Sequence, residues 1–503
     1  MLATRYPRLA NIGHKAITQY WQLKSHWVDY EFPKGSGAAT LSEAVVKQYN
    51  RQRPFGPKRR ICYAPFNNLH FTLNGNVVLC SFNGDHPVGH IEESTIEEIW
   101  FGEKAVEFRK QMASYNLDKC MNCQQVLERG NIPAFPPAKY DLHADDESVY
   151  PTQMSFEMSN LCNLECVMCS GEFSSSIQSN REKVPVSKYR YPENFIDQLD
   201  AFIPHLKIAT FIGGEPTMIK AYYEIWEAIV SRNPNCVIHV QTNATRLPEK
   251  FRKLLESGQF DVGVSIDAIT PEVYESIRVN ANYKEVMQNI EFLCGLHRQG
   301  KVYLNFNFCP IATNWRELPG MVQFANQRNV ILKILNVDGP NHLALRYRDA
   351  AFLSQVYESL SRHQPATSGG INVKRNEQAL KSYVQSLPKL IQLAQQRQQS
   401  LNILENQSLD ELKQLLWKEV SNNALYWHYA VNERQSFFQH CIGFLEKESK
   451  DELIFKHVLA QIIHIHQTTN GDKNSGKGID AIFTDFKSLA TGFMVLKLSD
   501  NGL

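Results

Sequence analysis

The chain contains no apolar run long enough to span a bilayer, and its first residues, Met1–Arg8, lack the apolar core of a signal peptide. It also has almost no net charge. Its 53 Lys and Arg residues against 52 Asp and Glu residues give +1, which provides no general attraction to nucleic acid or to an anionic membrane. Nor is there an internal repeat beyond an alternation of strand and helix patterns. These absences predict a cytoplasmic protein without a nucleic-acid or membrane partner.

The composition that remains is typical of a globular protein with more than one domain. The 503 residues exceed what one ordinary core needs, and 43% of them are hydrophobic and 21% charged. The pattern along the chain predicts four segments. They are an N-terminal helix with a linker (1–55), a small cysteine-containing domain (56–135), a domain of strands and helices (150–345) and a mainly helical C-terminal region (350–503).

The eleven cysteines are the most informative residues, because clustered cysteines in a reducing compartment are more apt to bind metal than to form disulfides. Seven of them lie in two clusters. The other four are scattered singly, and we expect them to be core thiols: Cys236, Cys294, Cys309 and Cys441.

From residue 152 short β-prone runs alternate with longer amphipathic stretches, the pattern of βα units around a parallel sheet. In barrels of such units the chemistry lies at the carboxyl ends of the strands. The expected strands are 153–158, 208–212, 236–242, 261–266, 302–308 and 330–337. The expected helices are 194–205, 221–232, 248–257, 283–299 and 315–327.

Three cysteines at spacing C-x3-C-x2-C follow the first of these strands: Cys162, Cys166 and Cys169. Three thiolates on one short loop can hold three irons of a cubic [4Fe–4S] cluster and leave the fourth iron without a protein ligand. The spacing alone also permits a zinc knuckle or three unrelated buried thiols.

In this context the loop resembles that of the radical S-adenosylmethionine (SAM) superfamily. The resemblance implies an α/β fold built on a partial (β/α)6 TIM-like barrel. It also implies that the open iron binds the amino and carboxylate groups of SAM. An electron from the cluster then cleaves SAM to methionine and a 5′-deoxyadenosyl radical, which abstracts a hydrogen atom from the substrate.

Further residues match the SAM-binding motifs of this family, each after a strand. Gly213-Gly214-Glu215-Pro216 resembles the GGEP motif, in which glycines allow close backbone approach and the carboxylate accepts hydrogen bonds from the SAM ammonium. Asn243 matches the TNG motif, but Ala244 replaces its glycine, which makes a positive φ less comfortable there.

The fourth strand ends at Ser265-Ile-Asp267, and the resemblance assigns such polar groups to the ribose or carboxylate of SAM. Arg278 matches an arginine that pairs with the SAM carboxylate, a task that its planar guanidinium suits. Met168 stands where many relatives have an aromatic residue beside the adenine.

A second cysteine cluster precedes the strand–helix domain and consists of Cys62, Cys80, Cys120 and Cys123. Asn74-Gly75 predicts a hairpin before the second of these, and Ser94–Glu97 a capping box that opens a helix. The stretch resembles the SPASM/twitch domains that carry auxiliary [4Fe–4S] clusters. It has the cysteines of the shorter twitch type, and it precedes the barrel, whereas such domains usually follow it. A structural zinc site is the alternative, since C-x2-C pairs are also zinc ligands.

The resemblance to SPASM/twitch enzymes suggests oxidative modification of a peptide or protein, with an electron donor such as flavodoxin or ferredoxin. Dehydrogenation of a small molecule, such as a sugar-derived alcohol, is the main alternative, and a non-catalytic, zinc-stabilised binding protein is another. No strand end offers an obvious general base. We assign Cys309 no role.

The remaining segments carry fewer signals. Residues 8–23 are expected to form an amphipathic helix, and residues 34–60 a linker. Ser408 and Glu411 predict the start of a C-terminal helix. The aromatic residues 426–429 are expected to pack between helices.

Overall fold

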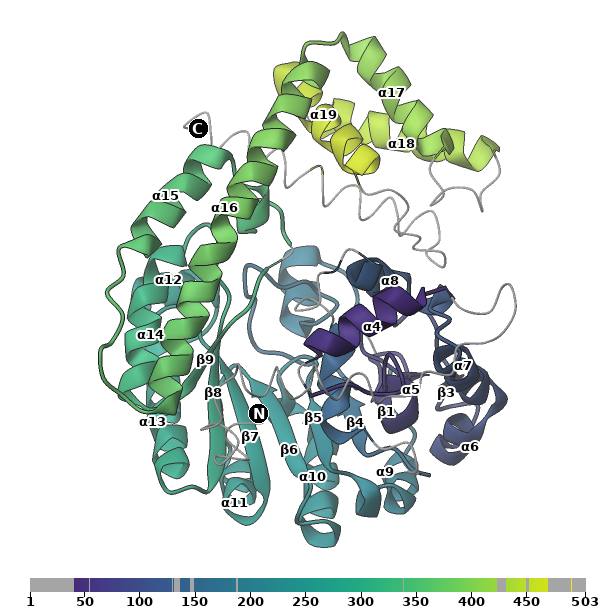
Figure 1. The fold of residues 1–503 in the computed structure, drawn as a ribbon. Coiled ribbons are helices and arrows are strands. Elements are labelled where there is room, and N and C mark those ends of the chain that lie inside the picture. The colour runs from purple at the N-terminus through teal and green to yellow at the C-terminus, as the bar shows by residue number, and fades with distance from the viewer. Residues whose placement is uncertain are drawn as a thin grey trace. The chain divides into compact units, whose positions relative to one another are not determined.

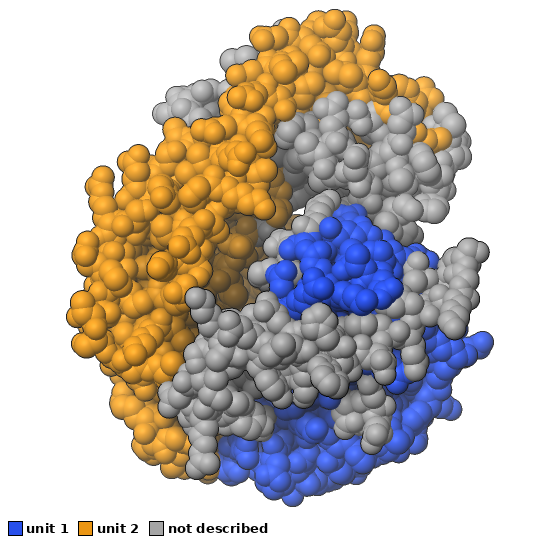
Figure 2. All heavy atoms as spheres, in the orientation of Figure 1, with its two compact units in different colours: residues 1–160, 187–239, 257–259 blue, residues 161–186, 240–256, 260–503 orange. Residues whose placement is uncertain are grey.

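The computed structural model describes residues 40–53, 55–128, 130, 136–144, 149–186, 189–337, 339–422, 431–448, 452–468 and 490 (Figure 1). The chain divides into two compact units, coloured separately in Figure 2. The first unit comprises residues 1–160, 187–239 and 257–259, and the second comprises residues 161–186, 240–256 and 260–503. The expected helix over 8–23 and the aromatic residues 426–429 lie outside the described residues. The division into four segments stays a prediction.

The first unit contains five strands in the order β3-β2-β1-β4-β5. Strand β1 pairs antiparallel with β2 through the predicted turn, where Gly75 has φ +82°, so the hairpin is confirmed. On its other side β1 pairs parallel with β4, which in turn pairs parallel with β5. The strands are β1 (Asn68–Phe71), β2 (Asn76–Val78), β3 (Gly89–His90), β4 (Gln153–Phe156) and β5 (Ile208–Phe211).

A row of phenylalanines runs across the three parallel strands. The register places Phe71 opposite Phe156, and Phe156 opposite Phe211. Their rings stack with centroids 5.3 Å and 4.8 Å apart, and all three side chains are fully buried. Aromatic pairs at this spacing add to the free energy of apolar burial. The cysteine-containing hairpin and the first strand of the predicted barrel therefore share one sheet and one core.

Side-chain caps open two helices of the first unit, and Ser42 caps the first of them, α4, by accepting a hydrogen bond from Val45 N. Helix α6 opens with a capping box in which Thr95 and Glu98 exchange hydrogen bonds. The prediction of Ser94 and Glu97 was therefore wrong by one residue. The helices are α4 (Glu43–Gln52), α5 (Ala64–Asn67), α6 (Ile96–Phe101), α7 (Glu103–Ala113), α8 (Met121–Glu128), α9 (Phe195–Gln198) and α10 (Lys220–Arg232).

Strand β6 (Val237–Thr242) runs from the first unit into the second, where β7 (Gln259–Ser265), β8 (Val302–Phe308) and β9 (Ile331–Ile334) follow in parallel. Each lies within a few residues of its predicted position. The helices between them are α11 (Glu249–Ser257), α12 (Pro271–Ile277), α13 (Tyr283–Arg298) and α14 (Leu318–Gln327), of which only α12 was not predicted. The α/β fold class is confirmed, and closure into a partial barrel stays a prediction.

Among the described residues after 350 helices predominate, as predicted, and Ser408 caps α17 through reciprocal bonds with Glu411. The long helix α16 passes from β9 to a group of three helices (Figure 1). Asn376 of α16 accepts a hydrogen bond from Leu332 N and donates one to Val330 O, so it satisfies backbone groups of β9. Among the described residues, no helix is long and apolar enough to cross a membrane. The helices are α15 (Ala350–Ser361), α16 (Ile371–Glu405), α17 (Leu409–Asn422), α18 (Val431–Glu448) and α19 (Glu452–Thr468).

Candidate functional site

The three-cysteine loop lies in the second unit and is held by its own backbone and by serines that follow it. Cys169 N donates to Cys166 O at 3.0 Å, which closes a tight turn between these two ligand positions. The hydroxyl groups of Ser175 and Ser176 donate to Cys162 O at 3.2 and 2.8 Å. These bonds fix the backbone at all three cysteines, as a preorganised cluster site requires.

Arg181 gives the loop a further support that the sequence pattern did not reveal. Its guanidinium donates to Cys166 O at 3.4 Å and to Cys169 O at 2.5 Å. It lies on a π-helical turn, Ile177–Glu182, and such turns are frequent at functional sites. The π-helical turn marks Arg181 as a candidate functional residue, but this turn is visible only in the structure and not in the sequence.

Arg278 lies beside the three-cysteine loop. Its Nη1 is 3.8 Å from Cys166 Sγ, and its Nη2 is 2.6 Å from a carboxylate oxygen of the buried Asp267. Burial alone would lower the pKa of Arg278, but Asp267 and the Cys166 thiolate raise it, so the guanidinium stays charged. Its Nε has no hydrogen-bond partner among the described residues. A carboxylate of a bound ligand would satisfy this buried N–H group.

The turn after β6 is tied to the cluster loop by asparagine side chains. Asn243 donates to the side-chain oxygen of Asn163 at 3.2 Å and accepts from the amide and hydroxyl groups of Thr245. Ala244 adopts φ +55° and is fully buried. The left-handed conformation that glycine favours in this motif is thus retained, in spite of the methyl group.

The structure also shows the contacts of two predicted SAM-binding residues, Ser265 and Met168, and of the singly placed cysteines. The Ser265 hydroxyl accepts a hydrogen bond from Gln241 at 2.6 Å. Met168 is partly buried and packs against an apolar cluster that contains Ile277. Cys309 is only partly buried, and its amide donates to Asp267, so the expectation of a core thiol was wrong for this cysteine. It was right for Cys236, Cys294 and Cys441, which are buried.

The GGEP segment lies in the first unit, directly after β5. Gly213 has φ +115°, and a Cβ built there would lie 2.6 Å from the carbonyl oxygen of Ser159. Gly214 N donates to the same oxygen at 2.9 Å. The buried Glu215 accepts hydrogen bonds from the amide and hydroxyl of Thr217. The glycine is therefore required by the chain's own backbone, and Glu215 already has partners within its loop.

Tyr222 of α10 joins the ends of β4 and β5 and was also missed from sequence. Its hydroxyl accepts a hydrogen bond from Met158 N at 2.9 Å and lies 2.8 Å from Ile212 O. Met158 lies just before the three-cysteine loop, and Ile212 lies just before the GGEP segment. A lone tyrosine in an amphipathic helix gives no signal of such a role.

The structure also brings together the four cysteines of the second cluster, within the first unit. Beyond the effect of burial, charge repulsion from each of the other three thiolates raises the pKa of Cys62, so the four thiols lie close enough to interact. Burial raises the pKa of all four thiols, that of Cys123 to about 12, and repulsion by neighbouring thiolates adds to the effect at Cys62, Cys120 and Cys123. Cationic iron would offset that repulsion, so this donor set fits an iron–sulfur cluster.

These thiols are not gathered as tightly as a single ion demands. Among the described residues, no group of three or more histidine, cysteine or carboxylate side chains is placed to hold one metal ion. In a cubic cluster each thiolate binds a different iron, so the thiolates do not meet at one point.

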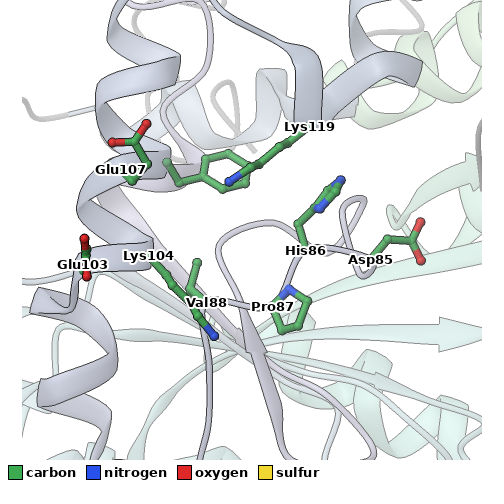
Figure 3. A pocket seen from close by; sticks show the side chains of 9 residues that line it. Asp85, His86, Pro87, Val88, Glu103, Lys104, Glu107 and Lys119 are labelled. Carbon is green, nitrogen blue, oxygen red and sulfur yellow. The ribbon is translucent and has the colours of Figure 1, made fainter. Parts of the chain in front are cut away.

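A cavity of about 570 Å³ opens in the first unit, between segments that neighbour Cys80 and Cys120 in the chain (Figure 3). One wall is the loop that follows Cys80, another is α7, and the third is Lys119, the neighbour of Cys120. Its lining mixes acidic and basic side chains over a small apolar surface: Asp85, His86, Pro87, Val88, Glu103, Lys104, Glu107, Phe108 and Lys119.

Comparison with known protein families agrees with both sites. Residues 156–310 match the family described as the radical SAM superfamily, and residues 62–124 match SPASM, described as an iron–sulfur cluster-binding domain. The first match begins at the last residue of β4 and contains the three-cysteine loop. The second spans all four auxiliary cysteines and favours iron–sulfur over zinc.

Individual relatives cover only parts of the chain. Over 148 residues it is 31% identical to a cysteine-type anaerobic sulfatase-maturating enzyme of Clostridium novyi, covering 27% of this chain and 38% of that protein. A probable GTP 3′,8-cyclase of Methanocaldococcus jannaschii is 27% identical over 36% of this chain and 57% of its own length. The matched stretch is thus less than two thirds of either relative.

Among solved structures, anSMEcpe with bound AdoMet has a TM-score of 0.32 at 19% identity, covering 42% of this chain and 58% of that one. Residues 156–310 belong to the radical SAM superfamily, with a [4Fe–4S] cluster and SAM as cofactors, and a SPASM domain for an auxiliary cluster precedes them.

Proposed function

We propose that this enzyme modifies a peptide or protein by an oxidation that begins with hydrogen-atom abstraction. The observation that carries the proposal is the pairing of a three-thiol loop beside Arg278 with a separate site of four thiols. With both cofactors bound, the radical SAM cluster supplies a 5′-deoxyadenosyl radical and the auxiliary cluster supplies an electron acceptor. The substrate would lose one hydrogen atom to the radical, then one electron and one proton.

The chain's own residues have separate tasks in this scheme. Cys162, Cys166 and Cys169 would hold the first cluster, and the charged Arg278 would bind the carboxylate of SAM through its unpartnered Nε. Asp267 orients that guanidinium through the 2.6 Å contact. Gly213, Gly214, Glu215, Asn243, Ser265 and Met168 remain proposed SAM contacts. For Glu215 this requires an exchange of its present bonds to Thr217.

A protein substrate is favoured by the likeness to a sulfatase-maturating enzyme, whose name states that it acts on a protein. The likeness to probable GTP cyclases supports the alternative, a small-molecule substrate. The same proposal has three further parts. The enzyme is an oxidoreductase, its electron donor is of the flavodoxin or ferredoxin type, and it acts in the cytoplasm. A short precursor-like reading frame beside this gene would support the peptide substrate, and a sugar pathway there would contradict it.

The reaction class is tested by anaerobic reconstitution with iron and sulfide, followed by dithionite and SAM. We expect release of 5′-deoxyadenosine, measured by liquid chromatography with mass spectrometry. Changing Cys162, Cys166 and Cys169 together to alanine should abolish it. Cys294→Ala, which removes a buried thiol of α13, is the matched control and should retain it. Equal release from the triple variant would refute the assignment.

A further inference from the structure

The four auxiliary thiols differ in how many hydrogen bonds they receive from the surrounding chain. Ala64 N donates to Cys62 Sγ and Phe82 N donates to Cys80 Sγ, both at 3.4 Å. These two bonds come from the backbone two residues after each cysteine, so the local turn provides them. Side chains reach the same group of four thiols from further positions.

Asn83 provides the first of these side-chain contacts. A turn in which Asn83 N donates to Cys80 O at 3.0 Å brings this side chain round towards a different ligand. Its Nδ2 then donates to Cys120 Sγ at 3.5 Å. One short segment therefore supplies a ligand, Cys80, and a hydrogen bond to another, Cys120.

Tyr140 and Lys139 contact the residue that follows Cys80, from a 3₁₀ helix at Pro136–His143. The buried Tyr140 hydroxyl accepts a hydrogen bond at 3.4 Å from Ser81 N, the residue next to Cys80. Lys139 donates to the Ser81 hydroxyl at 3.2 Å, and its ammonium lies 4.9 Å from the ring centroids of both Phe82 and Tyr140. A cation and a hydroxyl thus converge on the Cys80 side.

Hydrogen bonds to cluster sulfurs and nearby positive charge stabilise the more negative, reduced form of an iron–sulfur cluster. We propose that Asn83 and Tyr140 are positioning residues that raise the reduction potential of the auxiliary cluster, Asn83 through its hydrogen bond to Cys120 and Tyr140 through the hydroxyl dipole that its bond to Ser81 N holds beside Cys80. The inference rests on the proposed function, in which this cluster takes up one electron from the substrate radical. Without these bonds the cluster would be a weaker oxidant, although all four ligands would remain.

The potential of this cluster can be measured by itself in the full chain that carries Cys162→Ala, Cys166→Ala and Cys169→Ala. In that background we compare Asn83→Ala and Tyr140→Phe by redox titration followed by electron paramagnetic resonance. Tyr191→Phe is the matched control, because this tyrosine of the first unit donates to Thr72 O and to no thiol among the described residues.

We expect each test variant to shift the balance between reduced and oxidised cluster about tenfold towards the oxidised form, which is about 59 mV for a one-electron couple. Iron and sulfide contents should stay equal to those of the background chain. Tyr140→Phe keeps the buried ring, so it tests the hydroxyl even where Asn83→Ala loses iron.

Potentials equal to that of Tyr191→Phe would overturn the inference while leaving the proposed function intact. Zinc without labile sulfide in the background chain would overturn both the inference and the electron-acceptor role. Absence of 5′-deoxyadenosine from the unchanged enzyme would refute the proposed reaction, and the potentials would still report on Asn83 and Tyr140.

Discussion

Gly213→Ala should be among the most damaging small substitutions in the chain, for two separable reasons. The residue has φ +115°, where a side chain is strained by about 1–3 kcal/mol. The added Cβ would also lie 2.6 Å from Ser159 O, a backbone atom that cannot rotate away. Moving packed backbone typically costs about 1–3 kcal/mol. We therefore expect a loss of about 2–6 kcal/mol in the free energy of unfolding.

Two other glycines separate these contributions. Gly300 also has a positive φ, +73°, but a Cβ there meets nothing within 4 Å, so Gly300→Ala should cost only about 1–2 kcal/mol of backbone strain. Gly295 lies inside α13 with open space around it, so Gly295→Ala should stabilise by about 1 kcal/mol. The order of the three variants is therefore fixed by geometry.

Urea denaturation of the full-length proteins gives the order, and hydrogen exchange measured by mass spectrometry shows where each change acts. Gly213→Ala should speed exchange in peptides covering β4 and β5, because the bond from Gly214 N to Ser159 O is lost. If Gly213→Ala destabilised no more than Gly300→Ala, the close approach to Ser159 would not be the reason for this glycine.

Three further predictions rest on single contacts. Tyr222→Phe removes the hydroxyl that joins the ends of β4 and β5 and leaves a buried N–H unpaired, so unfolding by urea should become easier by about 2–4 kcal/mol. An unchanged denaturation midpoint would contradict this role. Asn376→Ala should cost about 1–3 kcal/mol and speed hydrogen exchange in β9, whereas the exposed Asn402→Ala should do neither. Hydrogen bonds from Thr95 lower the pKa of Glu98, so its contribution to helix α6 is present above the ordinary glutamate pKa and lost as the pH falls through the lower folded value. The protection factors of amides in α6, which correct for the pH dependence of intrinsic exchange, should therefore fall in acid, and Glu98→Gln should abolish that fall.

Local patterns predicted most of the helices and strands of this fold, because the alternation of strands and the periodicity of helices are visible in the sequence alone. The capping box shows the limit. Ser94 and Thr95 are each followed, three residues later, by a glutamate, so both registers satisfy the pattern. Gln198 accepts the hydrogen bond of Ile96 N at 2.8 Å, a contact across the first unit that supports the observed register. No feature within the segment reveals it.

Spacing predicted the thiols of both sites, because three or four ligands of one cluster impose a pattern on the sequence. Spacing could not predict the residues that hydrogen bond to these cysteines. Arg181 and Asn83 are single polar residues whose tasks depend on the turns that present them. Asp267 and Arg278 were each expected to contact SAM, but their 2.6 Å contact joins segments that sequence treats as independent.

The pairing of β1 with β4 makes the auxiliary domain part of the structural support for the sheet. A chain shortened to begin near residue 150 would leave β4 with an unpaired row of backbone groups and an exposed Phe156. Such an edge recruits strands from other chains, so the shortened protein should form aggregates in place of a working fragment.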